Sequence, residues 1–191
     1  MGIRSFLAFE LPPEIRDVVR RTSDDFRKTP ADVRWVKAEN IHLTVVFLGH
    51  IEERVIEKIG HAAETLCRGY GALDIAIEGV GFFPDMRRPR VLWLGLAGDL
   101  ERMSSFRDSL QRDLTPFGIK EEKRPFRPHL TLGRFKTPQR ITGVLEERLL
   151  EHRDLTSPVC PLRELTLFKS TLKPGGAVYS KLATWPLSGD Q

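Results

Sequence analysis

One short stretch occurs twice in the chain and restricts its possible folds more than any other feature. His42-Leu43-Thr44-Val45 is matched by His129-Leu130-Thr131-Leu132, and the two histidines lie 87 positions apart (129 − 42). In a chain with five histidines, two chance occurrences of His-Leu-Thr have odds on the order of one in a thousand. The repeat therefore predicts an internal duplication, so the fold should contain two similar halves.

Each copy of the motif lies in a run typical of a β-strand, at residues 41–48 and 130–135. Side chains alternate between the two faces of a strand, so the histidine and threonine of each copy point to the same side. Each copy then offers one proton-transfer group and one hydroxyl on a single face. For one copy alone, a half-exposed strand that happens to carry these residues is the simpler interpretation. The duplication favours a functional one.

The order of predicted elements also repeats. The pattern strand, helix, motif strand, helix, strand predicts repeat units at about 3–86 and 89–172, and a last strand at 177–186, within a single domain of residues 1–191. The same shift of 87 lays Phe6 on Trp93. Strands at 3–11, 34–36, 72–83, 91–96 and within 158–171, and helices at 13–26, 52–68, 100–114 and 141–149, complete the prediction, with a turn at Pro174-Gly175-Gly176.

This mixture of hairpin-spaced strands and helices predicts an α+β fold. We expect two lobes related by a pseudo-twofold axis, each an antiparallel sheet with helices, and a cleft between the lobes. A doubly wound parallel sheet is the alternative, but no glycine-rich phosphate loop follows a strand to support it.

Composition excludes several classes of protein. A hydrophobic content of 40% and a charged content of 29% are those of an ordinary globular protein. No apolar run approaches the roughly 20 residues of a membrane helix, and the first ten residues do not resemble a signal peptide. Cys67 and Cys160 form no Cys-x-x-Cys pair, which excludes a cysteine-based zinc site and suits a reducing compartment. We therefore expect a cytoplasmic location and no membrane partner.

Positive charge is concentrated around the second motif. The net charge is +4, but residues 120–140 alone carry +5 (seven basic minus two acidic), so the rest of the chain sums to −1. A basic field around a histidine favours an anionic ligand such as a phosphate or a nucleic acid. A solvated charged loop is the alternative. The basic residues of this window are Lys120, Lys123, Arg124, Arg127, Arg134, Lys136 and Arg140.

If the two lobes face each other, His42 and His129 converge with Thr44 and Thr131 beside them. Two histidines with ordinary pKa values of about 6.5 can supply one acid and one base near neutral pH. Hydroxyls and a cation suit the oxygens of a phosphoryl group, so the pattern predicts metal-free opening of a strained phosphodiester. Zinc would need three or four ligands, commonly at His-x-x-x-His spacing, and each motif has one histidine. The other histidines, which have no counterpart one repeat away, are interpreted as surface or helix-face residues: His50, His61 and His152.

The sequence around the two motifs resembles a known family. The first set of segments is similar to the first motif of the bacterial and archaeal RNA 2′,3′-cyclic phosphodiesterases, originally called 2′–5′ RNA ligases, of the two-histidine phosphoesterase superfamily. It comprises Arg34-Trp35-Val36, Glu39-Asn40-Ile41-His42-Leu43-Thr44 and Phe47-Leu48-Gly49. A second segment is similar to the second motif of this family: Arg124-Pro125-Phe126-Arg127-Pro128-His129-Leu130-Thr131-Leu132-Gly133-Arg134. A further family segment is matched by Pro89-Arg90-Val91-Leu92-Trp93.

The resemblance implies a bilobal α+β fold and no metal. We also expect no cofactor and a monomeric protein. The resemblance further implies hydrolysis of the 2′,3′-cyclic phosphate at RNA ends to a 2′-phosphate, with possible reversible 2′–5′ RNA ligation. In this family the first histidine gives a proton to the 3′ oxygen and the second is the base for water, which implies those roles for His42 and His129, with Thr44 and Thr131 on the phosphate. A hydrolase of small cyclic nucleotides and a non-catalytic RNA-binding module are the alternatives.

The two halves differ at one position next to the motifs, where the shift of 87 lays Arg134 on Phe47. We predict that Arg134 binds the phosphate and that Phe47 lies on the apolar or base-facing side. Strict alternation would put Arg134 on the face opposite His129, so the prediction requires the strand to bulge or end near Gly133. A surface arginine in an already basic window is the alternative.

Overall fold

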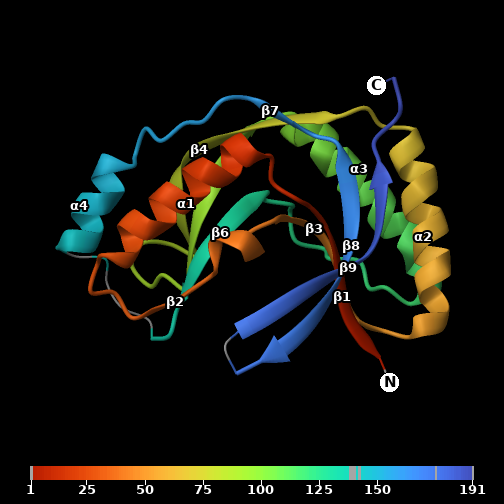
Figure 1. Ribbon diagram of the computed structural model, residues 1–191, viewed down its shortest axis with the longest axis horizontal. Coiled ribbons are helices and arrows are strands. Elements are labelled where there is room, and N and C mark those ends of the chain that lie inside the picture. The colour runs from red at the N-terminus through yellow and green to blue at the C-terminus, as the bar shows by residue number, and fades with distance from the viewer. Residues whose placement is uncertain (1, 138–140, 142, 175, 191) are drawn as a thin grey trace.

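The computed structural model describes residues 2–137, 141, 143–174 and 176–190, and these form four α-helices and nine β-strands (Figure 1). The strands are β1 (Ile3–Phe9), β2 (Val33–Trp35), β3 (Leu43–Ile51), β4 (Leu73–Phe83), β5 (Val91–Gly98), β6 (His129–Phe135), β7 (Cys160–Leu162), β8 (Glu164–Lys173) and β9 (Gly176–Pro186). The helices are α1 (Pro13–Arg27), α2 (Glu53–Arg68), α3 (Leu100–Leu114) and α4 (Val144–Glu151), with short 3₁₀ turns η1 (Ala38–Asn40) and η2 (Thr115–Phe117).

The strands form two separate sheets. One has the order β3-β1-β8-β9 and the other the order β2-β6-β5-β4-β7. All the strand pairs are antiparallel, so the predicted α+β class is confirmed and the doubly wound parallel alternative is wrong. No helix in the described part of the chain is long and apolar enough to cross a membrane.

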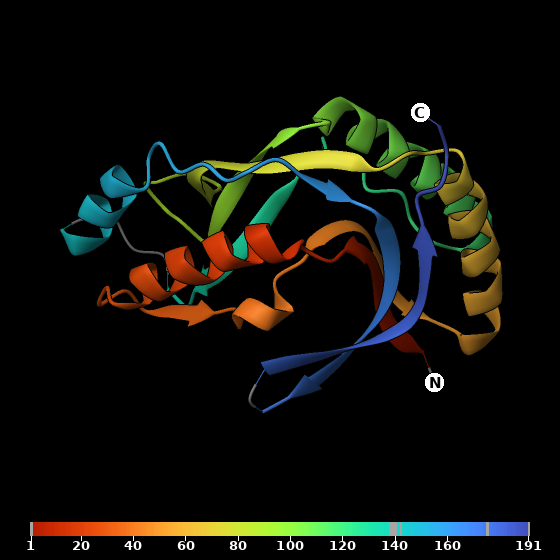
Figure 2. The ribbon, with the colours of Figure 1, turned by 45° about the horizontal axis from the view of Figure 1, so that its top comes forward.

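The two halves exchange elements, which corrects the expectation that each repeat forms its own lobe. Strand β4, from the first half, pairs with β5, and β8, from the second half, pairs with β1. The helices are exchanged as well: α2 and α3 lie along the four-stranded sheet, whereas α1 and α4 lie along the other (Figures 1 and 2). Because each half supplies strands to both sheets, one continuous core contains Leu7 and Leu43 of the first sheet and Leu94 and Leu130 of the second.

Each sheet turns one face to the helices and keeps the other free of them. Helix α1 begins at Pro13, where a missing N–H costs nothing, and buries an apolar stripe that includes Ile15, Val19 and Phe26. The core that contains this stripe also takes Leu43 and Leu130, the middle residues of the two His-Leu-Thr copies. The flanking histidines and threonines therefore point to the opposite, helix-free face, as alternation predicts.

Both motif strands contain a β-bulge at the same place. In β3, Thr44 and Val46 pair with consecutive residues of β1, so Val45 has no partner across the ladder. In β6, Thr131 and Gly133 pair with consecutive residues of β5, which leaves Leu132 in the equivalent position, 87 residues on (132 − 45). An extra residue reverses the alternation beyond it. Two successive residues are buried at each bulge, and the next ones, Phe47 and Arg134, are exposed.

Gly133 is required by the close approach of β2. A Cβ added there would lie 2.4 Å from Cγ1 of Val33 and 3.1 Å from Cε3 of Trp35. Any larger residue would push β2 away from the strand that carries the second motif.

Several element boundaries differ from the predicted ones. The first strand ends at Phe9 rather than at residue 11, and the helix predicted at 141–149 is α4, which begins at Val144. The strand expected within 158–171 is divided into β7 and β8. Arg140 of the basic window, Thr142 and the turn residue Gly175 lie outside the described residues.

Candidate active site

His42 lies directly before β3 and is held by a backbone carbonyl and aromatic rings. Its Nδ1 is 2.8 Å from the carbonyl oxygen of Asn40, the last residue of η1. Asn40 is in turn fixed by its side-chain amide, which donates to the carbonyl of Ala177 in β9 at 3.0 Å. The imidazole is half-buried, stacks on Phe6 with ring centroids 4.6 Å apart, and meets the edge of Tyr179 at 5.1 Å.

His129, the first residue of β6, is held in the same way. Its Nδ1 is 2.7 Å from the carbonyl oxygen of Arg127, again two residues earlier in the chain. Phe83 meets the ring edge to face with a centroid distance of 4.9 Å, and the indole of Trp93 lies 6.4 Å away. The two histidines thus have equivalent backbone partners at equivalent positions, as the duplication predicts.

This arrangement fixes the tautomer of both imidazoles. A carbonyl oxygen can only accept a hydrogen bond, so Nδ1 of each ring carries the proton and donates it. In the neutral ring Nε2 is then the unprotonated nitrogen, and within the described residues it has no hydrogen-bond partner on either histidine. Each Nε2 is therefore free to take up a proton or, once protonated, to give one away.

The environment favours neutral rings at neutral pH. Burial lowers the pKa of His42 and of His129, and the hydrogen bond to the backbone carbonyl partly opposes this effect by raising it. The positive charge of Arg134 further lowers the pKa of His129. The positive charge of Arg134 therefore favours an unprotonated His129, and no such charge effect is found for His42 among the described residues.

The two threonines lie half-buried on the histidine side of their strands. Thr44 pairs with Ala8 and Thr131 with Trp93 in the neighbouring central strands. No hydrogen-bond partner is found for either hydroxyl among residues 2–137, 141, 143–174 and 176–190. Both hydroxyls can therefore donate to a ligand at this face.

The bulges bring Arg134 and Phe47 to the same face as the histidines. The obstacle that strict alternation raised for Arg134 is absent, because Leu132 interrupts the alternation one residue before Gly133. Phe47 is 71% exposed, and its ring lies 6.4 Å from that of Phe6, which stacks on His42. Strands β3 and β6, which follow or contain the two histidines, are in contact at the junction of the sheets (Figure 1).

The aromatic rings around the histidines were not predicted as part of the site. Phe6 lies in β1 and Trp93 in β5, the central strands that flank the motif strands. The alignment of Phe6 with Trp93 by the shift of 87 was the available signal, because residues at equivalent positions beside equivalent histidines should have equivalent neighbours.

The remaining histidines and the cysteines lie elsewhere. His50 and His61 are exposed on β3 and α2, and His152, at the end of α4, contacts Asp25 of α1 at 2.9 Å. Cys67 and Cys160 are buried thiols without a disulfide bond. Among the described residues no three His, Cys, Asp or Glu side chains gather to hold a metal ion.

Comparison with known proteins identifies the family to which this chain belongs. Residues 11–173 match the model of the 2′-5′ RNA ligase superfamily. The chain is 34% identical to an RNA 2′,3′-cyclic phosphodiesterase of Methanothermobacter thermautotrophicus over 98% of its own length and 100% of that protein. Its fold is similar to that of TT0787 of Thermus thermophilus (TM-score 0.82, 25% identity, 99% and 100% of the two chains). It is also similar to that of E. coli LigT complexed with 3′-AMP (TM-score 0.78, 24% identity, 98% and 99%). The chain belongs to the 2′-5′ RNA ligase superfamily.

Proposed function

We propose that this protein hydrolyses the terminal 2′,3′-cyclic phosphate of RNA to a 2′-phosphate, with two histidines as acid and base and without a metal ion. The observation that carries the proposal is the matched pair of Nδ1 hydrogen bonds, 2.8 Å at His42 and 2.7 Å at His129, which leave both Nε2 atoms available. A relative named RNA 2′,3′-cyclic phosphodiesterase, similar over its full length, supports the same activity.

In the proposed reaction His129 is the general base. Its neutral Nε2 takes a proton from a water molecule, and the water oxygen forms a bond to phosphorus. The cation of Arg134 supports this role because it disfavours a protonated ring before the reaction. After the step, the imidazolium of His129 releases its proton to solvent.

His42 is the general acid. The bond between phosphorus and the 3′ oxygen breaks, and protonated Nε2 of His42 gives its proton to the leaving oxygen, which becomes the 3′-hydroxyl. Burial lowers the pKa of His42, and the negative charge of a bound phosphate acts in the opposite direction and favours the imidazolium. The nearby cation acts on His129 and not on His42, which supports this assignment of roles rather than the reverse.

Thr44, Thr131 and Arg134 bind the non-bridging oxygens of the phosphate. The hydroxyls donate to the negative charge that develops there, and the guanidinium can supply two parallel donors. Phe47, at the position equivalent to Arg134, provides an apolar surface on the base-facing side. With a 5′-hydroxyl in place of water, the same two proton transfers give a 2′–5′ linkage, so reversible ligation is part of the proposal.

The proposal names RNA rather than a small cyclic nucleotide as the substrate. Four cations in the segment before His129 are exposed, and a polyanion can use several of them at once. These are Lys120, Lys123, Arg124 and Arg127. A monomer in the cytoplasm is sufficient for this function, since both motifs lie in one chain.

A product assay in EDTA tests the function. The protein is incubated with an oligonucleotide that ends in a 2′,3′-cyclic phosphate and, separately, with a small cyclic nucleotide, and the phosphomonoester is identified by ³¹P NMR. We expect a 2′-phosphate on the oligonucleotide. Faster turnover of the small nucleotide would favour the alternative hydrolase, and binding of RNA without turnover would favour the non-catalytic module. Loss of activity on chelation, with recovery on adding one metal, would contradict the metal-free mechanism.

A further inference from the structure

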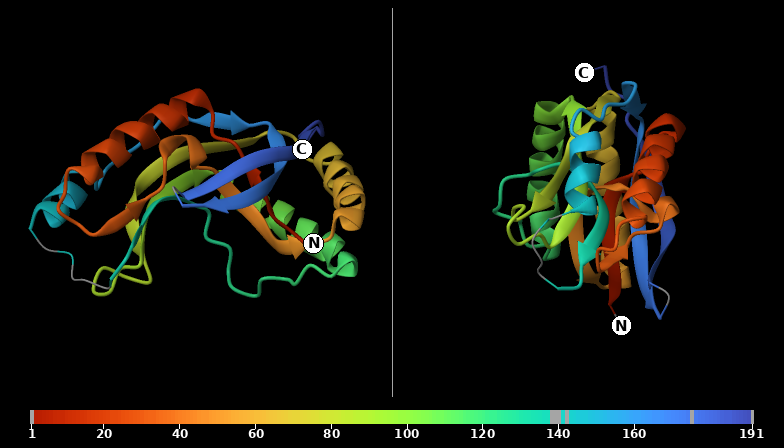
Figure 3. Two further views of the ribbon diagram at one scale, coloured as in Figure 1. Left: turned by 60° about the horizontal axis from the view of Figure 1, so that its bottom comes forward. Right: turned by 90° about the vertical axis from the view of Figure 1, so that its left-hand side faces the viewer.

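The segment between η2 and His129 supplies the carbonyl that holds the catalytic base, yet it has no helix or strand of its own. Residues 118–128 form a long loop that leaves the end of α3 and returns to β6 (Figure 3). Arg127, near its end, provides the oxygen for Nδ1 of His129. A loop of this length, without ladder hydrogen bonds, must be fixed by side chains if that oxygen is to stay in place.

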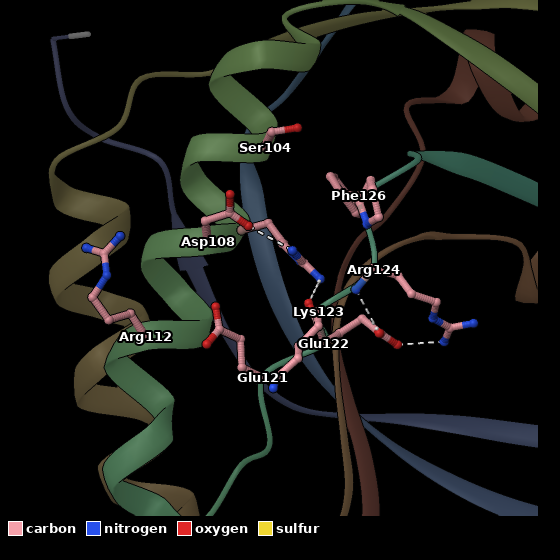
Figure 4. Close-up of a pocket in the computed structure, with 10 residues that line it drawn as sticks. Ser104, Asp108, Arg112, Glu121, Glu122, Lys123, Arg124 and Phe126 are labelled. Atoms are coloured by element: carbon pink, nitrogen blue, oxygen red, sulfur yellow. Dashed lines mark hydrogen bonds and ion pairs between the residues drawn. The ribbon is translucent and has the colours of Figure 1, made fainter.

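Two buried polar side chains of α3 fix the loop at one residue, Glu122. Nη2 of Arg107 donates to the carbonyl of Glu122 at 2.9 Å, and the amide N–H of Glu122 donates to Oε1 of Gln111 at 3.0 Å. Arg107 is only 7% exposed and Gln111 only 3%. Both backbone groups of Glu122 are therefore held by the helix, as they would be by a neighbouring strand. Figure 4 shows the bond to the carbonyl of Glu122.

A second contact links Arg107 to the end of the loop. Its guanidinium lies over the ring of Phe126, 5.5 Å from the centroid, and its Nη1 donates to Asp108 at 2.8 Å. Phe126 immediately precedes Arg127, whose carbonyl accepts from His129. The chain of contacts from Arg107 to the imidazole thus passes through Phe126 and one peptide bond.

Stability alone is a poor reason for these residues to be buried. A buried arginine is costly to desolvate, and Nε of Arg107 and Nε2 of Gln111 find no partner among the described residues. Apolar side chains of similar size would fill the same space without that cost. Apolar side chains could not hydrogen-bond to the backbone N–H and the carbonyl of Glu122, as Gln111 and Arg107 do.

The first half has no equivalent of this contact. The positions 87 residues earlier are Arg20 and Asp24, both exposed on α1. There the carbonyl that holds His42 belongs to η1 and is fixed from β9 through Asn40. The clamp on the loop, here called the α3 clamp and made of Arg107 and Gln111, therefore serves only the second histidine.

We propose that the α3 clamp is a positioning device: Arg107 and Gln111 hold the 118–128 loop so that the carbonyl of Arg127 keeps His129 in the tautomer and orientation of the general base. The catalytic consequence rests on the function proposed above. Arg107 is a positioning residue, because it acts on the base through Phe126 and Arg127. A hydrogen-bonded residue behind an imidazole of this kind commonly changes activity about 10- to 100-fold when it is removed, by analogy with metal-bound histidines.

An open cavity of about 510 Å³ beside the clamp makes a chemical-rescue experiment feasible. The cavity lies between α3 and the loop, and Arg107 and Phe126 are among the residues that line it (Figure 4). Truncation in Arg107→Ala leaves a space that guanidinium ion can enter from solvent. Arg112, on the same helix and exposed, lines the same cavity and provides the matched control, Arg112→Ala.

The first measurement is of His129 itself, by ¹⁵N NMR of the imidazole in both variants and in the parent protein. In Arg107→Ala we expect the Nδ1–H tautomer of His129 to become mixed and its pKa to fall, because the carbonyl hydrogen bond that raises it is weakened. The signals of His42 should stay unchanged, since its carbonyl is fixed from β9. Guanidinium should restore the His129 signals in Arg107→Ala, and Arg112→Ala should match the parent protein throughout.

The second measurement is turnover of a cyclic-phosphate oligonucleotide. We expect kcat to fall about 10- to 100-fold in Arg107→Ala with little change in KM, and guanidinium to recover part of the loss. Arg107→Lys, which keeps the charge but cannot reach Glu122, Asp108 and Phe126 together, should show the same changes to a smaller extent.

Unchanged His129 signals in folded Arg107→Ala would overturn the proposal, whatever the activity. If Arg107→Ala does not fold, Arg107→Lys and Gln111→Leu carry the same test, and unchanged signals in both would overturn it too. Shifted His129 signals in a protein whose parent turns over no cyclic phosphate would support the positioning role and reject the proposed function. The two proposals therefore fail separately.

Discussion

The two halves of this protein hold their histidines alike and surround them differently. At both motifs the carbonyl two residues before the histidine accepts a hydrogen bond from Nδ1. Each motif strand also has a β-bulge at the equivalent position, which turns the side chain two residues beyond it to the histidine face. That side chain is Phe47 in one half and Arg134 in the other. The duplicated backbone explains why the two histidines are presented in the same way, whereas the unlike neighbours support the proposed assignment of His129 as base and His42 as acid.

The rings beside the histidines differ in a related way. In the first half Phe6 pairs across the sheet with Phe168, and the two rings stack at 5.2 Å beside His42. In the second half the equivalent Trp93 pairs with Gly81, and its indole occupies the space over the glycine, 2.3 Å from where a Cβ would be. The pair Trp93 and Gly81 in the second half thus takes the place of the pair Phe6 and Phe168 in the first half. Aromatic rings therefore flank both histidines, but they come from Phe6 and Phe168 beside His42 and from Trp93 and Phe83 beside His129.

Removing either histidine is the most severe way to test the comparison. His42→Ala and His129→Ala should each lower cyclic-phosphate hydrolysis by at least about 10³-fold, toward the upper end of the effect of one proton transfer. The double variant should be little worse than either single one, because the two groups act as a unit. Steady-state kinetics with folding checked by circular dichroism measures this, and His50→Ala, on an exposed histidine of β3, is the control. Unchanged activity in either single variant would end the two-histidine mechanism.

Making the halves alike at the bulge is the second test. Arg134→Phe should lower turnover on the order of 10²-fold, because the phosphate loses the cation beside His129 while the apolar side is duplicated. Arg134→Lys keeps the charge but not the two-pronged donor geometry, so we expect a smaller but clear loss. Phe47→Ala should mainly raise KM for the oligonucleotide. Full activity in Arg134→Lys would mean that only charge matters here, and full activity in Arg134→Phe would reject the phosphate assignment.

The threonines should have weaker and nearly equal effects. Thr44→Val and Thr131→Val each remove one donor to the developing charge, a loss worth about 10²–10³-fold in strong cases and on the order of 10-fold here, because several donors share the phosphate. Nearly equal losses of activity in the two variants would show that both halves bind the phosphate alike, since the two threonines occupy equivalent half-buried positions. A large effect at one threonine and none at the other, measured as kcat on the same oligonucleotide, would show that the phosphate binds to one half alone.

Part of this architecture could be predicted from the sequence, and part could not. The His-Leu-Thr repeat, the alternating apolar residues and the helix periods are local signals, so the motif histidines, the α+β class and most elements were predictable. The exchange of β4 and β8 between the sheets was not, because a strand with one apolar face can pair with either partner. The bulge in β6 was anticipated as a requirement of the Arg134 prediction. The bulge in β3 was missed, although the successive apolar residues Val45 and Val46 were a signal for it.

The α3 clamp could not be predicted for a different reason. Arg107 belongs to a helix rich in charged residues, where an arginine ordinarily lies on the solvated face. Its burial depends on the path of a loop that begins at residue 118, beyond the end of the helix, which no local pattern specifies. Contacts of this kind are visible only when the whole chain is folded.

The smallest expected effect concerns the pH dependence of the two halves. The pKa of His129 is lowered by burial and by Arg134, whereas that of His42 is lowered by burial, with no charged neighbour contributing among the described residues. Arg134→Gln removes one of the two causes, so the pKa of His129 should rise toward its usual range while that of His42 stays unchanged. A base must be unprotonated, so the acidic limb of the kcat/KM profile should move to higher pH in the variant. NMR titration of both imidazoles, with Arg87→Gln on an exposed loop as the control, separates this shift from a general loss of charge. If the acidic limb followed His42 instead, the roles of base and acid would have to be exchanged between the halves.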